Sequence, residues 1–233
     1  MDRLFHLKET YLKNISRAGS DVEFILLDYG SSDGVGEWAA QNLSGVKLIR
    51  TNARYWVASH AKNIVHKAAS GDILCNLDCD VTIPEGFSDY LREELSAGNR
   101  IASSEERDEF GNYGCSGLVA VLKNHFYSVN GYDESMNLGW GFDSSNFTFR
   151  VSKKNSLETS LIRGAVCLPH SDEFRTARCQ LKEISFTSAM SSRISDAMAE
   201  SEDYVANRFS EWGVSDILPA LAEGTDPPRT SYF

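Results

Sequence analysis

Residues 70–80 read SGDILCNLDCD, an apolar segment that ends in two aspartates one residue apart. Residues 73–77 are short and apolar, which is typical of a strand buried in a parallel sheet. Asp78 and Asp80 follow at its carboxyl end. Ligands of open α/β sheets bind in the crevice outside the carboxyl ends of the strands. The segment therefore predicts a buried strand with a polar site at its end.

Strand-like and helix-like segments alternate on both sides of this stretch, which is typical of an α/β domain with a mostly parallel central sheet flanked by helices. From about Cys179 onward the chain becomes serine-rich, acidic and helical in pattern. We therefore expect one α/β domain over residues 1–173 and a helical C-terminal appendage with a polar tail over residues 174–233. The expected helices cover 4–18, 35–43, 58–68 and 123–131 and a segment after residue 143, and the expected strands cover 22–27, 46–49, 73–77, 117–122 and parts of 157–168.

The composition narrows the class of protein. The chain has 233 residues, a net charge of −10 and 42% hydrophobic residues, an ordinary globular mixture. The acidic balance argues against non-specific binding of nucleic acid, which depends on basic patches. The five cysteines are odd in number and show no zinc-ribbon spacing, so we expect reduced thiols. No apolar run is long enough to span a membrane, and we expect a cytoplasmic protein or one at the membrane periphery.

Asp78 and Asp80 are the strongest chemical signal. Two carboxylates at a strand end can bind one Mg²⁺ or Mn²⁺ ion, and such an ion can hold a diphosphate. The alternative interpretation is a solvated turn. His170 follows another apolar stretch, and its imidazole could complete a mixed site of histidine and carboxylate ligands, although a lone histidine after a strand is more often a hydrogen-bonded surface residue.

Two further groups of residues could bind a substrate. Arg54, His60 and Lys62 could place positive charge beside a diphosphate, or they could lie along a helix with only their charged ends in water. The segment 139–143, GWGFD, has glycines that permit a close approach on both sides of Trp140, whose ring suits the C–H face of a sugar. Asp143 at the start of the next helix could be a general base or merely a helix cap.

Together these segments resemble the inverting glycosyltransferases of GT-A type, family 2, and also the galactosyltransferase C-terminal domain type. Their order and spacing over about residues 3–172 are more specific than any single motif. The matching segments are LDYGSSDG at 27–34, HAKN at 60–63, SGDILCNLDCD at 70–80, VNGYDE at 129–134, GWG at 139–141 and Arg150.

The resemblance implies transfer of a sugar from a nucleotide-diphosphate donor, with a UDP-sugar favoured, to a carbohydrate or other hydroxyl acceptor with inversion. It implies that Mn²⁺ or Mg²⁺ is held by Asp78, Asp80 and His170. Asp143 fills the first acidic position of the family's loop, and it is the catalytic base only if it shifts into that role from the neighbouring position. It also implies that Trp140, Gly141 and Asp143 line the acceptor site. The donor-binding residues it implies are Asp28, Ser31, Arg54, Lys62, Asn63 and Asp78.

The sequence departs from the family pattern in three places. Ser144 stands where the family has the basic carboxylate, and loss of a general base typically costs about 10²–10⁴-fold in rate. Tyr29 replaces the second acidic residue of the loop that reads the nucleotide base. The family begins with an apolar strand, whereas this chain begins inside the first helix, so we expect unpaired strand edges unless residues ahead of Met1 or another segment take that place.

Three functions compete on this evidence. The favoured one is an active, metal-dependent inverting glycosyltransferase, with a homo-oligomer through the C-terminal helices as one option and no nucleic-acid partner. The second is a catalytically impaired relative that binds a sugar nucleotide or glycan. The third, a nucleotidyltransferase, is disfavoured because such enzymes usually begin with a basic, glycine-rich phosphate loop, and the chain shows none.

Overall fold

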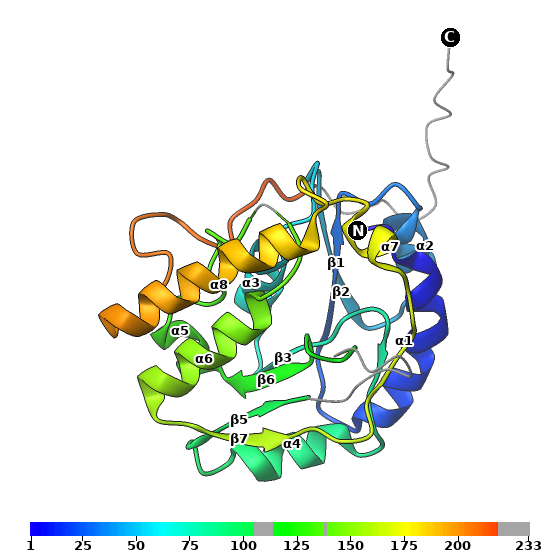
Figure 1. Cartoon of the computed structure of the whole chain (residues 1–233). Coiled ribbons are helices and arrows are strands. Elements are labelled where there is room, and N and C mark those ends of the chain that lie inside the picture. The colour runs from blue at the N-terminus through cyan, green and yellow to red at the C-terminus, as the bar shows by residue number, and fades with distance from the viewer. Residues whose placement is uncertain (105–113, 138, 219–233) are drawn as a thin grey trace.

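A computed structural model describes residues 1–104, 114–137 and 139–218 (Figure 1). Its N-terminal part alternates helices and strands at the places that the sequence pattern predicts. The two strands of this part, β1 and β2, pair in parallel over their whole length. The elements are α1 (Leu4–Ala18), β1 (Phe24–Tyr29), α2 (Val35–Asn42), β2 (Val46–Thr51) and α3 (Ala58–Ala68).

The larger sheet has the order β3-β6-β5-β7. Strands β3 and β5 each pair antiparallel with β6, and β7 pairs parallel with β5. Three of these four strands therefore run in one direction, which agrees with the expected mostly parallel sheet, and β6 is the exception. The strands are β3 (Ile73–Asn76), β5 (Arg100–Ser103), β6 (Val119–Leu122) and β7 (Glu158–Leu161).

Strands β1 and β3 share no ladder, so the two sheets are separate in the described part of the chain. The apolar run at the start of β1 is only half-buried. A continuous apolar run is typical of a strand that is buried on both faces. A cavity of about 90 Å³ lies between the sheets, lined by Phe24, Leu26 and Leu77 and closed on one side by α1. In the described part of the chain, no strand other than β2 pairs with β1 and none other than β6 pairs with β3, which agrees with the expected unpaired strand edges.

Several short elements escaped the sequence analysis. They are β4 (Val81–Thr82), α4 (Phe87–Leu95), β5 and α7 (Asp172–Thr176), while the expected region 157–168 forms β7 and β8 (Val166–Cys167). The two-residue pair β4–β8 matters most, because it joins the segment after Asp80 to the segment before His170. The backbone N–H of Leu168 also donates to the carbonyl of Asp80 at 2.8 Å.

The C-terminal region packs on the domain through α8 (Ile184–Ser201), which lies along α6 (Asp143–Asn155) in Figure 1. The Asn146 amide donates to the Ser195 hydroxyl at 2.9 Å across this contact. Residues 173 and 174, the expected boundary between domain and appendage, both lie inside α7, and that division stays a prediction. The expected polar tail at 224–228 lies outside the described residues.

Helix α5 (Lys123–Ser128) is shorter than expected. Its Phe126 belongs to an apolar core that also contains Leu74 of β3, Val121 of β6 and Phe147 of α6. Among the described residues, no helix combines the length and the apolar character that a membrane crossing requires.

His66 is a buried titratable group that packs against this core. Its ring stacks on Phe126 at 5.1 Å between centroids, and its Nδ1–H donates to the Lys62 carbonyl at 2.6 Å. Burial lowers the pKa of His66 to about 4. Because the unfolded chain titrates near pH 6.5, it binds more protons than the native state between pH 6.5 and 4, and stability falls as the pH is lowered through that window.

We therefore predict that His66 costs the native state roughly 3 kcal/mol between pH 7 and pH 4. Urea unfolding as a function of pH, for the wild type and His66→Leu, measures this contribution as a difference of slopes. The variant should lose less stability on acidification than the wild type. Equal slopes in this window would contradict the prediction.

Candidate active site

The Asp78–Asp80 turn leaves the end of β3 and is held from two sides. The Asn76 amide donates to Asp78 Oδ1 at 3.0 Å and to the Gly117 carbonyl at 2.7 Å. A Cβ atom on Gly117 would lie 1.9 Å from Asp78 Oδ2, so only glycine leaves room for this carboxylate. From the other side, Thr10 of α1 donates to the Cys79 carbonyl at 2.7 Å.

Asp80 and His170 meet although 90 positions separate them in the chain. His170 Nε2 lies 2.7 Å from Asp80 Oδ2, and both side chains are largely buried. The contact forms because β4 and β8 pair directly beside it. The structure thus brings together two of the three predicted metal ligands.

The two aspartates differ in their electrostatic surroundings. Burial raises the pKa of Asp78, and the nearby Asp80 adds to this, while the Lys62 ammonium opposes it. Burial would also raise the pKa of Asp80, but the hydrogen bond and charge of His170 together with Arg3 outweigh it, and the pKa is lowered. The turn therefore carries one carboxylate that is readily ionised and one that benefits from a nearby cation.

Lys62 joins the predicted donor side to the predicted base. Its Nζ donates to Asp143 Oδ2 at 2.5 Å and to the Ser144 hydroxyl at 2.8 Å, and the side chain is 7% exposed. Burial alone would lower the pKa of Lys62, but the charge of Asp143 raises it, so the ammonium stays ionised. Asp143 is the first residue of α6, and the helix cap is Phe142 rather than Asp143.

The residues predicted to contact the nucleotide base lie at the end of β1 and in the loop that follows it. Asp28 is 4% exposed, and its carboxylate accepts from the Ser31 N–H at 2.9 Å and from Arg50 Nε at 3.3 Å. The Ser31 hydroxyl accepts from the Asp2 N–H at 3.1 Å. Asp28 and Ser31 are therefore neighbours, and the N-terminus of the chain lies against the same loop.

Arg54 and Asn63 lie in contrasting places. Arg54 is exposed, with its guanidinium 5.2 Å from the centre of the Tyr55 ring. Asn63 is completely buried, and both of its amide hydrogens are used, one by the Tyr132 carbonyl and one by Glu134. These hydrogen bonds hold residues 131–134 against α3. Contact between Asn63 and a sugar-nucleotide donor stays a prediction.

The glycines beside Trp140 serve the contact with α8. Gly141 has φ of +104°, and an added Cβ would lie 2.7 Å from the Ser188 hydroxyl. A Cβ on Gly139 would lie 2.4 Å from Thr187 Cγ2. The close approach expected from these glycines is thus made by the chain's own helix, and the Thr187 hydroxyl donates to the Trp140 carbonyl at 2.9 Å.

Arg3 and His6 were missed by the sequence analysis. Arg3 directly precedes α1 and His6 lies within it, and the negative charge of Asp80 acts on both side chains. The Arg3 guanidinium lies 4.0 Å from the centre of the Phe174 ring. The signal was available in the sequence, because His6, Thr10 and Asn14 stand four residues apart and so share one helical face.

A metal ion would find suitable donors here. His170 Nδ1 is buried with no hydrogen-bond partner among the described residues, and carboxylate and imidazole together suit Mn²⁺. The described residues contain no group of three or more histidine, cysteine or acidic side chains already arranged around a metal position. The donor set therefore fits a cation at Asp80 and His170, and side-chain movement is required to bring in a third ligand.

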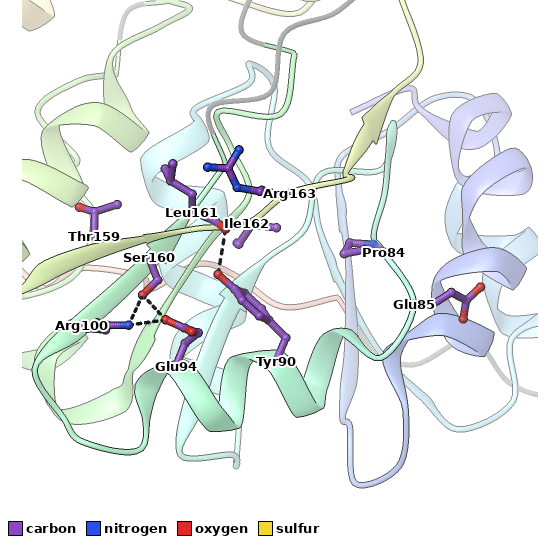
Figure 2. A pocket seen from close by; sticks show the side chains of 10 residues that line it. All are labelled: Pro84, Glu85, Tyr90, Glu94, Arg100, Thr159, Ser160, Leu161, Ile162 and Arg163. Carbon is purple, nitrogen blue, oxygen red and sulfur yellow. Dashed lines mark hydrogen bonds and ion pairs between the residues drawn. The ribbon is translucent and has the colours of Figure 1, made fainter.

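A larger cavity, of about 590 Å³, lies elsewhere and contains none of the predicted site residues (Figure 2). Its floor is a network in which Glu94 accepts from both Arg100 and Ser160. The Tyr90 hydroxyl donates to the Leu161 carbonyl at its edge. The size of this cavity does not make it the candidate active site, because Glu94, Arg100 and Ser160 already bond to one another there.

Residues 6–152, more than half of the chain, match the family model "Glycosyl transferase family 2". The chain therefore belongs to glycosyltransferase family 2. No curated protein matches the chain significantly.

Two solved structures share the fold. One is a mannosyltransferase, PcManGT from Pyrobaculum calidifontis in complex with GDP-Man and Mn²⁺, with a TM-score of 0.55 and 18% identity over 68% of this chain and 51% of that one. The other is GalNAc-T7 with UDP, GalNAc and Mn²⁺, with a TM-score of 0.54 and 15% identity over 67% of this chain and 39% of that one. The fold is thus of GT-A type. The chain spans about half or less of the length of these proteins.

Gly117→Ala should disrupt the aspartate turn while leaving the fold intact, because the new methyl group would displace the Asp78 carboxylate. We expect loss of Mn²⁺-dependent UDP binding in calorimetry, with a far-UV CD spectrum like that of the wild type. Gly71→Ala, near the other end of β3, is the matched control, because its nearest contact would be an ordinary 3.6 Å. Equal UDP affinity in both variants would show that UDP binding does not depend on the position of the Asp78 carboxylate.

Proposed function

We propose that this protein is a metal-dependent inverting glycosyltransferase that uses a nucleotide-diphosphate sugar, with a UDP-sugar favoured, and a hydroxyl acceptor. The observation that carries the proposal is the pairing of Asp80 with His170 at the end of β3. Family membership supports the reaction class. The carbohydrate acceptor and the inversion of configuration are parts of the proposal.

The donor would lie along the rim formed by the ends of β1 and β3. Asp28 and Ser31 would face the nucleotide base, and Asp78 and Asp80 with His170 would hold Mn²⁺ or Mg²⁺. Arg54 is the exposed cation of this set, while Lys62 and Asn63 act from buried positions. Trp140 and Gly141 would line the acceptor side, next to Asp143.

The chemical step is a single displacement. The Asp143 carboxylate takes the proton of the acceptor hydroxyl, the oxygen forms a bond to the anomeric carbon, and the bond from that carbon to the diphosphate oxygen breaks with its electron pair. When bound, the metal ion supplies positive charge that stabilises the departing diphosphate. Lys62 fixes Asp143 in position, at the cost of engaging one of its oxygens.

Asp80→Ala should weaken binding of UDP in the presence of Mn²⁺ by at least about tenfold and should leave binding of uridine unchanged, because only the diphosphate depends on the cation. Isothermal titration with both ligands, with and without Mn²⁺, measures this. Asp172→Ala is a suitable control, because its carboxylate is exposed and pairs only locally with Arg175. An equal loss for uridine and UDP would refute the metal role of Asp80.

A catalytically impaired binding protein is the second candidate, and one observation favours it. Ser144 occupies the position of the family's base, and the neighbouring Asp143 already accepts a hydrogen bond from Lys62. A carboxylate engaged by an ammonium group is a weaker proton acceptor than a free one. Such a protein would bind the donor and the metal but transfer the sugar slowly or not at all.

Two substitutions distinguish these candidates. If Asp143 is the base, Asp143→Asn should lower the transfer rate by about 10²–10⁴-fold while UDP binding persists. If the base has been lost, the wild type should bind donor without turnover, and Ser144→Asp should create transfer activity. Donor hydrolysis and transfer to simple sugar acceptors are the measurements. Unchanged transfer in Asp143→Asn would exclude this residue as the base.

We also propose a cytoplasmic or membrane-peripheral location, and the C-terminal helices as one surface for self-association. Phe186 and Met190 are exposed on α8. These two side chains give α8 an exposed apolar surface that a second copy of the chain would cover.

A further inference from the structure

Helix α1 turns a polar face toward the aspartate turn. His6, Thr10 and Asn14 are only 5%, 1% and 4% exposed, although all three side chains are polar. Thr10 donates to the Cys79 carbonyl, and Asn14 donates to the Val81 carbonyl at 2.9 Å. The Ile83 N–H in turn donates to Asn14 Oδ1 at 2.9 Å. Two of these three buried side chains are thus explained by hydrogen bonds to residues 79–83.

His6 is not explained in this way. Its Nδ1 is buried and has no hydrogen-bond partner in the described part of the chain. Buried polar atoms are nearly always paired, and each exception asks for a ligand, a water molecule or a special role. One turn before Thr10 on the same face, His6 lies beside the Asp78–Asp80 turn, and the Asp80 charge acts on it.

The imidazoles of His6 and His170 are neighbours. Their ring centres are 5.6 Å apart with an interplanar angle of 75°, and Phe174 packs against both rings. His170 also carries a buried Nδ1 with no hydrogen-bond partner among the described residues, while its Nε2 contacts Asp80. Two imidazoles with unpaired nitrogens therefore lie side by side next to one carboxylate.

We propose that His6 is a further ligand of the cation site, so that Asp80, His170 and His6 together bind a divalent metal ion before any nucleotide arrives. This inference rests on the proposed function, because it concerns the same site. The described residues do not already form a three-ligand arrangement, so binding requires rotation of the imidazoles and replacement of the Asp80–His170 contact by metal bonds. Arg3 faces the same carboxylate and competes with the cation for it.

The donor set determines which metal is favoured. Imidazole nitrogens favour transition metals, among which Mn²⁺ binds most weakly, whereas Mg²⁺ prefers oxygen ligands and water. A site with two imidazoles should therefore select Mn²⁺ over Mg²⁺. Two carboxylates with a single imidazole would discriminate less.

The test measures binding of Mn²⁺ alone to the full chain by EPR titration. His6→Phe removes the nitrogens and keeps a ring against Phe174 and His170. We expect this variant and His170→Phe each to bind Mn²⁺ at least about tenfold more weakly than the wild type. His125→Phe is the matched control, because His125 is also buried with an unpaired Nδ1 but lies on α5, and its affinity should be unchanged.

Each other result has a definite meaning. Wild-type affinity in His6→Phe together with loss in His170→Phe overturns the role of His6 and leaves the proposed function standing. Binding of Mn²⁺ only in the presence of UDP also overturns it, whereas absence of binding even with nucleoside diphosphates refutes both proposals. If His6→Phe does not fold, pulsed EPR of Mn²⁺ on the wild type counts the coordinating imidazoles: two support the inference and one overturns it.

Discussion

The rim of the site depends on the ion pair between Lys62 and Asp143. Three carboxylates, those of Asp78, Asp80 and Asp143, are crowded at the ends of β3 and α6, and an uncompensated buried charge is strongly destabilising. Lys62 neutralises Asp143 by direct contact and acts on Asp78 through its field. The partner of Asp80 is His170. Helix α3 thus supplies the cation that allows an acidic site to exist inside an acidic protein.

The same pair bears on the proposed role of Asp143 as the catalytic base. The ammonium group that fixes Asp143 in position also occupies one of its oxygens, and Ser144 offers no second carboxylate. The contact between Lys62 and Asp143 therefore stabilises the fold and at the same time hinders the Asp143 carboxylate from accepting a proton. The two proposed functions, sugar transfer and binding alone, differ in whether Asp143 can accept a proton while it holds this contact.

Long periodic segments were predictable, and short non-local ones were not. Helices at 4–18 and 58–68 appear as expected, because their local pattern and their packing agree. The two-residue strands β4 and β8 carry no periodicity of their own and exist only because they pair with each other. The glycines at 139 and 141 were correctly linked to a close approach, but only the packing of α8 shows what approaches.

The sequence by itself determined the fold class, the strand that ends in Asp78 and Asp80, and the family, because these follow from local pattern and motif order. Tertiary structure decided which side chains meet: His170 with Asp80, Lys62 with Asp143, and His6 beside both histidine and carboxylate. Such contacts join residues from 74 to 164 positions apart. Periodicity describes the nearest turns of the chain and contains no information on partners that only the folded backbone brings together.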